Sequence, residues 1–212
     1  MDPWINQFNR LYPAYKTTTF YKVCSIKEPG ADSPVNFLQL DITSCNGEQF
    51  PYQFAGDSNG LYTKANSQDP MKFNCDGIFC TTYQEKNILM LCELKSKFQT
   101  KEICHAKEQI IGTLIRLKAQ MSILQAKPDW EIHGVIASYE PTVESLTHIK
   151  DLEDYSSRFA KNIYSNRHKL LTAAMCRQPY DPLSVPDITI HYVGVPRGQQ
   201  TYQIPLADIL NL

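Results

Sequence analysis

The sequence feature that most constrains the fold is an unbroken apolar run, Ile88-Leu89-Met90-Leu91-Cys92, that ends in Glu93-Leu94-Lys95. Successive side chains of a β-strand point to opposite faces, so a run without a polar member is typical of a central strand covered on both faces. We therefore predict a central strand over residues 86–98. Apolar residues then recur every three or four positions, which predicts a long amphipathic helix over residues 101–125.

Shorter patterns predict the remaining elements. They indicate a helix over 2–15, strands over 20–26, 35–42, 71–83, 130–139 and 188–193, one or two helices over 143–175, a turn at 196–198 and a return strand over 202–204. Residues 55–70, rich in Gly, Asn, Asp and Ser, are expected to form a surface loop. Without an internal repeat or a low-complexity segment, the chain is expected to be one α/β domain over residues 1–212, with a central mixed β-sheet flanked by helices.

Cysteine content and charge limit the classes of protein to consider. The seven cysteines are an odd number, and the chain starts without the basic and apolar segments of a secretion signal. No apolar run approaches the roughly 20 residues of a membrane helix, so we expect a cytoplasmic protein with reduced thiols and no membrane association. Cys75 and Cys80 are not accompanied by a second pair of cysteines of the kind that a structural zinc site needs.

The net charge of -1 excludes non-specific coating of nucleic acid, so any contact with nucleic acid must use local basic patches.

Charged residues at the end of the central strand are predicted to converge with an acid on the preceding strand. Paired residue numbers in an antiparallel hairpin have a constant sum, so a hairpin that turns at Gln84-Glu85 places Asp76 opposite Glu93. Lys95 shares a face with Glu93 because strand side chains alternate with period two. A bulge would shift the register by one residue, yet diagonal neighbours would still bring the two carboxylates together.

Two interpretations of these charges are open, because charges in a sheet are costly unless they are paired or bound to metal. A salt bridge between Lys95 and one acid would meet that requirement without any function. Two carboxylates one strand apart also suit Mg²⁺ or Mn²⁺, with the backbone carbonyl of Leu94 and water as further ligands. Lys95 would then orient an attacking water or stabilise developing charge, which is the chemistry of metal-dependent phosphodiester hydrolysis.

The order of these elements resembles the PD-(D/E)xK, or restriction-endonuclease-like, superfamily. Cys75-Asp76-Gly77 stands where that family has its Pro-Asp, and Glu93-Leu94-Lys95 supplies the (D/E)xK. The resemblance covers about residues 70–140 and leaves residues 141–212 as a helical and β-hairpin elaboration. It implies a restriction-endonuclease-like core, in which Asp76 and Glu93 are metal ligands and Lys95 is the catalytic lysine.

The family often places a polar residue of the following helix near the site, and Gln109 is the candidate here. Lys101, His105 and Gln109 lie four residues apart and share one helical face, which is equally typical of a solvent-facing stripe. Thr113, four residues further on, differs from the Tyr of one subgroup. The acid that some members carry near their N-terminus has no evident match, since Asp2 and Glu28 are poorly placed.

Basic residues form two groups that can contact nucleic acid or simply face solvent. The first consists of Lys95, Lys97, Lys101 and Lys107, and the second of Arg158, Lys161, Arg167, His168, Lys169 and Arg177. If the chain is a nuclease, these residues are expected to contact the backbone of double-stranded DNA without reading its sequence: Lys97, Lys101, His105, Arg158, Lys161, Arg167 and Lys169.

The leading hypothesis is a Mg²⁺-dependent DNA endonuclease of the defence, restriction or repair type. Cutting both strands requires two sites, so a homodimer or a larger nuclease complex is expected. The alternative is a non-catalytic subunit of the same fold that binds nucleic acid or a protein partner. A cysteine enzyme using Cys104 and His105 is disfavoured, because adjacent helical residues do not face each other. No Gly-rich phosphate loop, GxSxG or HExxH motif supports another hydrolase class.

Overall fold

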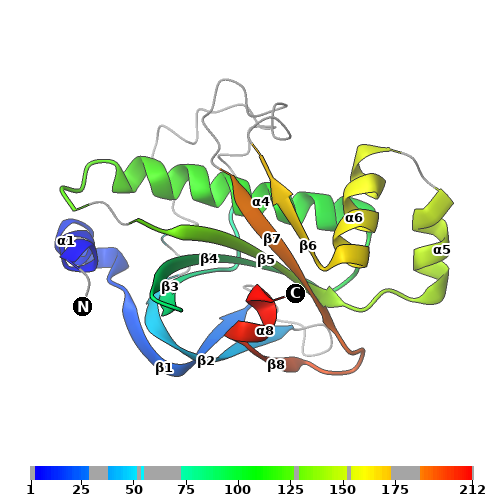
Figure 1. Cartoon of the computed structure of the whole chain (residues 1–212), viewed down its shortest axis with the longest axis horizontal. Helices are drawn as coiled ribbons and strands as arrows, with labels where there is room; N and C mark the ends of the chain where they lie inside the picture. The colour runs from blue at the N-terminus through cyan, green and yellow to red at the C-terminus, as the bar shows by residue number, and fades with distance from the viewer. Residues whose placement is uncertain are drawn as a thin grey trace.

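The computed structural model describes residues 3–28, 38–51, 54, 73–126, 129–151, 154–172 and 187–211. In this part of the chain, eight strands form one mixed sheet with helices against both faces (Figure 1). The strands are β1 (Thr18–Lys27), β2 (Gln39–Phe50), β3 (Gly77–Tyr83), β4 (Lys86–Lys95), β5 (Glu131–Tyr139), β6 (His168–Leu171), β7 (Ile188–Val195) and β8 (Thr201–Pro205). The helices are α1 (Pro3–Leu11), the 3-10 turn η1 (Pro13–Tyr15), α4 (Thr100–Met121), α5 (Val143–Asp151), α6 (Tyr155–Asn166) and α8 (Leu206–Leu210). The predicted fold class, α/β with a central mixed sheet flanked by helices, is confirmed.

Strand β4 is central, as its apolar sequence predicts. The sheet order is β1-β2-β3-β4-β5-β7-β6, and β4 lies between the antiparallel β3 and the parallel β5. Leu89 and Leu91 pack on the face that also contacts α4, whereas Ile88 and Met90 pack into a second core on the opposite face. Burial of both faces removes each of these side chains from water, which stabilises the fold by roughly 1.5–3 kcal/mol apiece.

Helix α4 lies lengthwise along one face of the sheet (Figure 1). Its buried residues include Ile103, Ile110, Leu114 and Leu117, which follow the predicted helical spacing. The helix ends at Met121 rather than near residue 125, because the Leu124 N–H bonds the Met121 carbonyl in a tighter turn. Helix α6 packs beside α4. None of the described helices is long and apolar enough to span a lipid bilayer.

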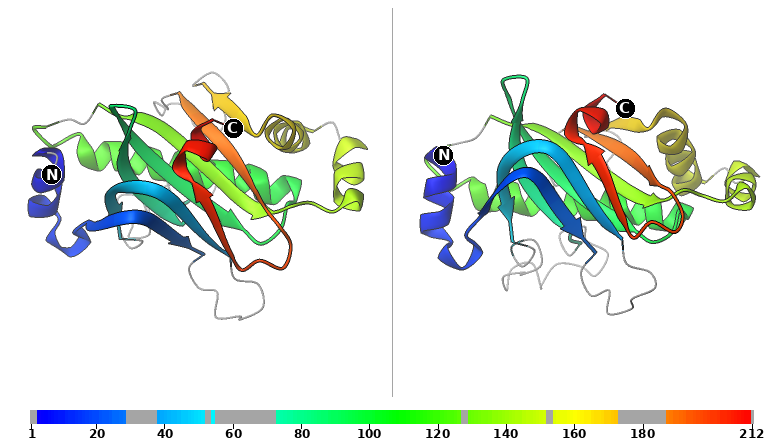
Figure 2. Two further views of the ribbon diagram at one scale, coloured as in Figure 1. Left: turned by 60° about the horizontal axis from the view of Figure 1, so that its bottom comes forward. Right: turned by 90° about the horizontal axis from the view of Figure 1, so that it is seen from below.

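The opposite face of the sheet is covered by α8 and by the curvature of the sheet itself. Strands β1 and β2 arch over it (Figure 2), with positive φ angles of 66° at Lys22 and 60° at Ser44 where the pair bends. One end of β2 pairs with β3 and the other end pairs in parallel with β8. The expected C-terminal β-hairpin is wrong, because β7 pairs with β5 and β6, whereas β8 pairs with β2.

Several predicted boundaries also differ from the structure. The helical region predicted over residues 143–175 contains α5 and α6, but α6 ends where Arg167 adopts a left-handed φ of 60°. The short edge strand β6 follows and was not predicted, and neither was α8. Strand β3 begins at Gly77, so residues 73–76 of the predicted strand are not paired in the sheet, and residues 71–72 lie outside the described residues. The predicted loop at 55–70 and the residues 35–37 and 173–175 lie outside the described residues.

Candidate active site

The β3–β4 hairpin has the predicted register. Tyr83 pairs with Lys86 across a two-residue turn, and Gly77 pairs with Cys92 at the far end. The turn residues Gln84 and Glu85 both have positive φ angles, 48° and 64°, as a type I′ turn requires. Continuing this register by one residue sets Asp76, directly before β3, opposite Glu93 on β4.

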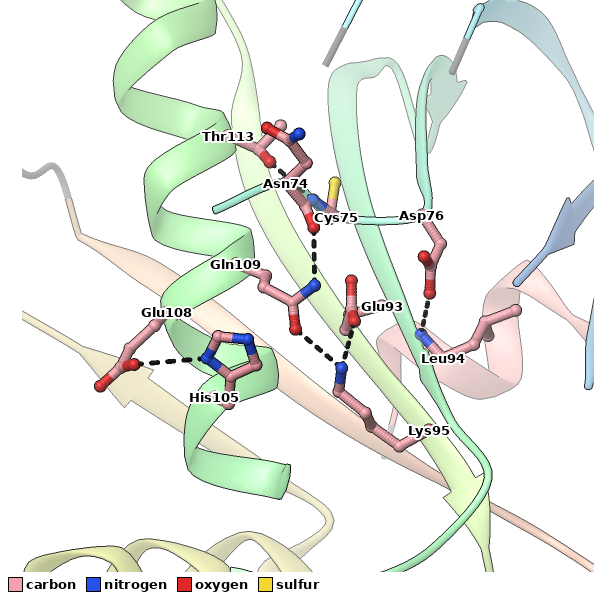
Figure 3. Close-up of polar contacts among 10 residues, drawn as sticks. All are labelled: Asn74, Cys75, Asp76, Glu93, Leu94, Lys95, His105, Glu108, Gln109 and Thr113. Carbon is pink, nitrogen blue, oxygen red and sulfur yellow. Dashed lines mark hydrogen bonds and ion pairs between the residues drawn. The ribbon is translucent and has the colours of Figure 1, made fainter. Parts of the chain in front are cut away.

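Lys95 connects the end of β4 to helix α4. Its Nζ donates to Glu93 Oε1 at 2.6 Å and to Gln109 Oε1 at 2.7 Å, as Figure 3 shows. The amide of Gln109 in turn donates to the backbone carbonyl of Asn74 at 2.8 Å. The Lys95 side chain is only 14% exposed, so this charge-assisted network lies largely out of water. The structure thus brings together Glu93, Lys95 and Gln109, as predicted.

Asp76 lies on the other side of this group and contacts the backbone of β4. Its Oδ2 accepts a hydrogen bond of 2.7 Å from the Leu94 N–H (Figure 3). Burial raises the pKa of Asp76 to about 7, although the Leu94 N–H and the charge of Lys95 act in the opposite direction. The carboxyl is therefore poised to change its protonation state near neutral pH, which is unusual for an aspartate and typical of functional sites.

Glu93 is almost completely buried, with only 1% of the residue exposed to solvent. Burial, and then the nearby charge of Asp76, raise the pKa of Glu93 well above its ordinary value, and Lys95 and the backbone N–H of Asp76 only partly oppose them. One carboxylate oxygen, Oε1, is bound by Lys95, but Oε2 is buried without a hydrogen-bond partner. A buried polar atom left unpaired costs about 1–3 kcal/mol, and more when it is charged.

The residues present fit a hard divalent cation. Among the described residues, no group of three or more His, Cys, Asp or Glu side chains is placed to hold a metal ion. Mg²⁺, however, often uses only one or two carboxylates and completes its shell with water. The N–H and C=O of one strand residue point to the same edge, so the Leu94 carbonyl is directed to the edge where Asp76 lies. Asp76, Glu93 and the Leu94 carbonyl together offer oxygen ligands, and Glu93 Oε2 is an oxygen in need of a partner.

The polar face of α4 that carries Lys101, His105 and Gln109 borders this site. His105 lies beside Gln109 in Figure 3, packs edge-on against Phe73 and holds its Nδ1 3.7 Å from Glu108 Oε2. Lys101 is exposed in the first turn of α4 and lines a cavity of about 440 Å³ together with residues near α5 and α6. Lys97 is exposed in the connection between β4 and α4. Cys104, by contrast, is buried, so it does not share a surface with His105.

The two predicted basic groups are only partly free to bind a polyanion. Lys107 is buried, and its Nζ lies over the rings of Tyr155 and Phe159, so its inclusion in a surface group was wrong. Arg167 is engaged by Glu140 at 3.3 Å and stacks on Tyr164.

The rest of the second basic group is spread over two elements. Arg158 is exposed on α6, Lys161 is half-buried on the same helix, and Lys169 is half-buried on β6. The His168 ring faces that of His191 on β7 at 6.4 Å between centroids. Arg177 lies outside the described residues.

Two residues that contribute to the site were named in the sequence but not assigned to it: Glu28 was judged poorly placed, and Thr113 was noted only as differing from the Tyr of one subgroup. Glu28, which follows β1, lies close enough for its charge to raise the pKa of Asp76, and Lys95 in turn opposes the rise that burial causes in the pKa of Glu28. Only the sheet order brings the end of β1 to this place, so no local pattern reveals it. Thr113 binds the segment that precedes Asp76, with its Oγ1 2.8 Å from the Cys75 N–H. In the sequence, this contact was indicated by the position of Thr113, four residues after Gln109 and therefore on the same face of the helix.

Comparison of the chain with models of protein families, with curated proteins and with solved structures found no significant match.

Proposed function

We propose that the chain is a metal-dependent phosphodiesterase of the restriction-endonuclease-like type that cleaves DNA internally. The observation that carries the proposal is the unpartnered, buried Glu93 Oε2 beside a second carboxylate and an ammonium. A carboxylate oxygen in that position is costly in the metal-free protein, and a bound cation would satisfy it. The strand-strand-helix-strand order around the site also agrees with the resemblance to the PD-(D/E)xK superfamily.

Asp76, Glu93 and the Leu94 carbonyl would hold Mg²⁺ or Mn²⁺. When bound, such an ion supplies polarisation of a phosphodiester oxygen and makes a water molecule more acidic. Lys95 would donate to the attacking water or to the charge that develops on the phosphate, because Glu93 and Gln109 take only two of the three N–H donors of its ammonium. Gln109 keeps that ammonium in place, since its own amide is fixed by the Asn74 carbonyl.

The proposed substrate is double-stranded DNA, bound along the first turns of α4 and the exposed side of α6. Lys97, Lys101 and Arg158 are the exposed cations in that region, and His105 borders the site itself. This small number of cations is enough for local contacts with phosphates but not for non-specific coating of DNA. It agrees with the net charge of -1. Cutting both strands would need a homodimer or a second nuclease subunit.

The test is cleavage of plasmid, linear duplex and single-stranded DNA with Mg²⁺, Mn²⁺ or EDTA. Wild type is expected to cut in a metal-dependent manner, and Asp76→Asn, Glu93→Gln and Lys95→Met are each expected to lower the rate at least a hundredfold. Glu131→Gln is the matched control, because Glu131 pairs with Lys86 at the opposite end of β4. Cleavage that survives the site variants contradicts the proposal. Metal and DNA binding without cleavage would instead indicate a non-catalytic subunit of the same fold.

A further inference from the structure

Three backbone groups directly before Asp76 are held by side chains from one face of α4. Arg116 Nη2 donates to the Phe73 carbonyl at 2.7 Å, and Gln109 Nε2 donates to the Asn74 carbonyl at 2.8 Å. The Cys75 N–H donates to Thr113 Oγ1 at 2.8 Å. Residues 109, 113 and 116 share a face because they are spaced by four and three. Figure 3 shows the Gln109 and Thr113 contacts converging on the segment that leads to Asp76.

This segment needs such support because the sheet does not provide it. The pairing of β3 with β4 begins at Gly77, so residues 73–76 have no ladder partner on β4. The Asp76 carboxylate is anchored at its tip by the Leu94 N–H. Its main chain is anchored one residue earlier by Thr113, which is 2% exposed. The Thr113 hydroxyl is therefore the group on α4 that fixes the backbone nearest to the acid.

We propose that Thr113 is a positioning residue that sets the distance between the Asp76 and Glu93 carboxylates through the Cys75 N–H. The inference rests on the proposed function, namely that these carboxylates bind a divalent cation. Groups that orient metal ligands without touching the metal typically contribute tenfold to a hundredfold to metal affinity. The contact is buried at both ends, since Cys75 is fully buried, so water cannot take the place of the lost hydroxyl.

The experiment is titration of the 212-residue chain with Mn²⁺ by calorimetry, together with thermal unfolding in EDTA. Thr113→Val keeps the shape of the side chain but removes the acceptor, and it is expected to weaken Mn²⁺ binding at least tenfold. Thr113→Ser keeps the hydroxyl and is expected to restore affinity to within about twofold of wild type. Thr113→Ala removes the acceptor without the extra methyl group, and it tests the same prediction if the valine variant does not fold.

Thr81→Val is the matched control. The buried Thr81 likewise bonds the backbone, although its hydroxyl donates, to the Asn46 carbonyl at 2.7 Å, and it lies further along β3 from the site. We expect Thr81→Val to lower the unfolding temperature without changing Mn²⁺ affinity. If Thr113→Val lowers only the unfolding temperature in the same way, Thr113 is merely structural and the inference is overturned. If wild type itself binds no Mn²⁺, the proposed metal site fails first and the inference falls with it.

Discussion

The substitution Asp76→Asn is expected to stabilise the metal-free protein, and to do so more at pH 8 than at pH 5. Burial is the main cause that raises the pKa of Asp76 from 3.8 to about 7 in the folded state. For an acid with a raised folded-state pKa, stability is highest below the unfolded pKa of 3.8 and is lost progressively as the pH rises to about 7. Asparagine keeps an oxygen for the Leu94 N–H but carries no charge.

The magnitude follows from the two pKa values of Asp76. They differ by about 3.2, and a pKa difference of one corresponds to about 1.4 kcal/mol, so ionisation costs the folded state about 4 kcal/mol at pH 8. At pH 5 the folded carboxyl is protonated and only the unfolded one is ionised, which reduces the cost to about 2 kcal/mol. The stability advantage of the asparagine variant is therefore expected to grow by about 2 to 3 kcal/mol between pH 5 and pH 8.

The assay is urea unfolding of both proteins in EDTA at several pH values from 5 to 8. Glu131→Gln is the control of opposite sign, because Lys86 lowers the pKa of that exposed carboxylate and its loss should not stabilise the fold. Added Mg²⁺ is expected to raise the stability of wild type at pH 8 and to leave the Asp76→Asn variant unchanged. A stability difference that does not vary with pH, or an asparagine variant that is less stable than wild type at pH 8, would refute the reasoning.

Two further predictions concern residues of the sheet outside the site. Burial lowers the pKa of His191 to about 3, so its contribution to stability is lost as the pH falls below 6.5. This loss is about 2 kcal/mol between pH 7 and pH 5, and His191→Gln should remove it when acid unfolding of the two proteins is compared in urea. In the β3–β4 turn, both residues have a left-handed backbone, so Gln84→Asn with Glu85→Gly should stabilise the protein by about 1 kcal/mol. Calorimetry should then show a higher unfolding temperature, with DNA cleavage unchanged.

The geometry of the site could be predicted where it depends on local periodicity. The alternation of side chains along β4 sets Glu93 and Lys95 on one face, and the hairpin register sets Asp76 opposite Glu93. Even the unfavoured turn residues Gln84 and Glu85 did not disturb this register, because both adopt the positive φ angles of a two-residue hairpin turn. Helix α4 was equally predictable, because its apolar residues recur at helical spacing on the face that packs against the sheet.

Features that depend on contacts between distant segments could not be predicted. Strand β6 is four residues long and mostly exposed, and it exists because it pairs with β7. Strand β8 pairs with β2 rather than with its neighbour in sequence, which no local pattern encodes. The same limit applies to Glu28, whose proximity to the site depends on how β1 and β2 arch across the sheet.

A structural ion pair accounts for only half of the arrangement at the end of β4. Lys95 and Glu93 alone would satisfy each other, and a protein selected only for stability would leave the position opposite Glu93 neutral. Here Asp76 places a second carboxylate there, whose charge raises the pKa of Glu93 further, while Glu93 Oε2 remains unpartnered. Side chains of α4 hold the backbone that carries this destabilising acid, although it lies beyond the paired part of β3. A second carboxyl that is costly to ionise and is nonetheless held in place supports the proposal that a cation binds there.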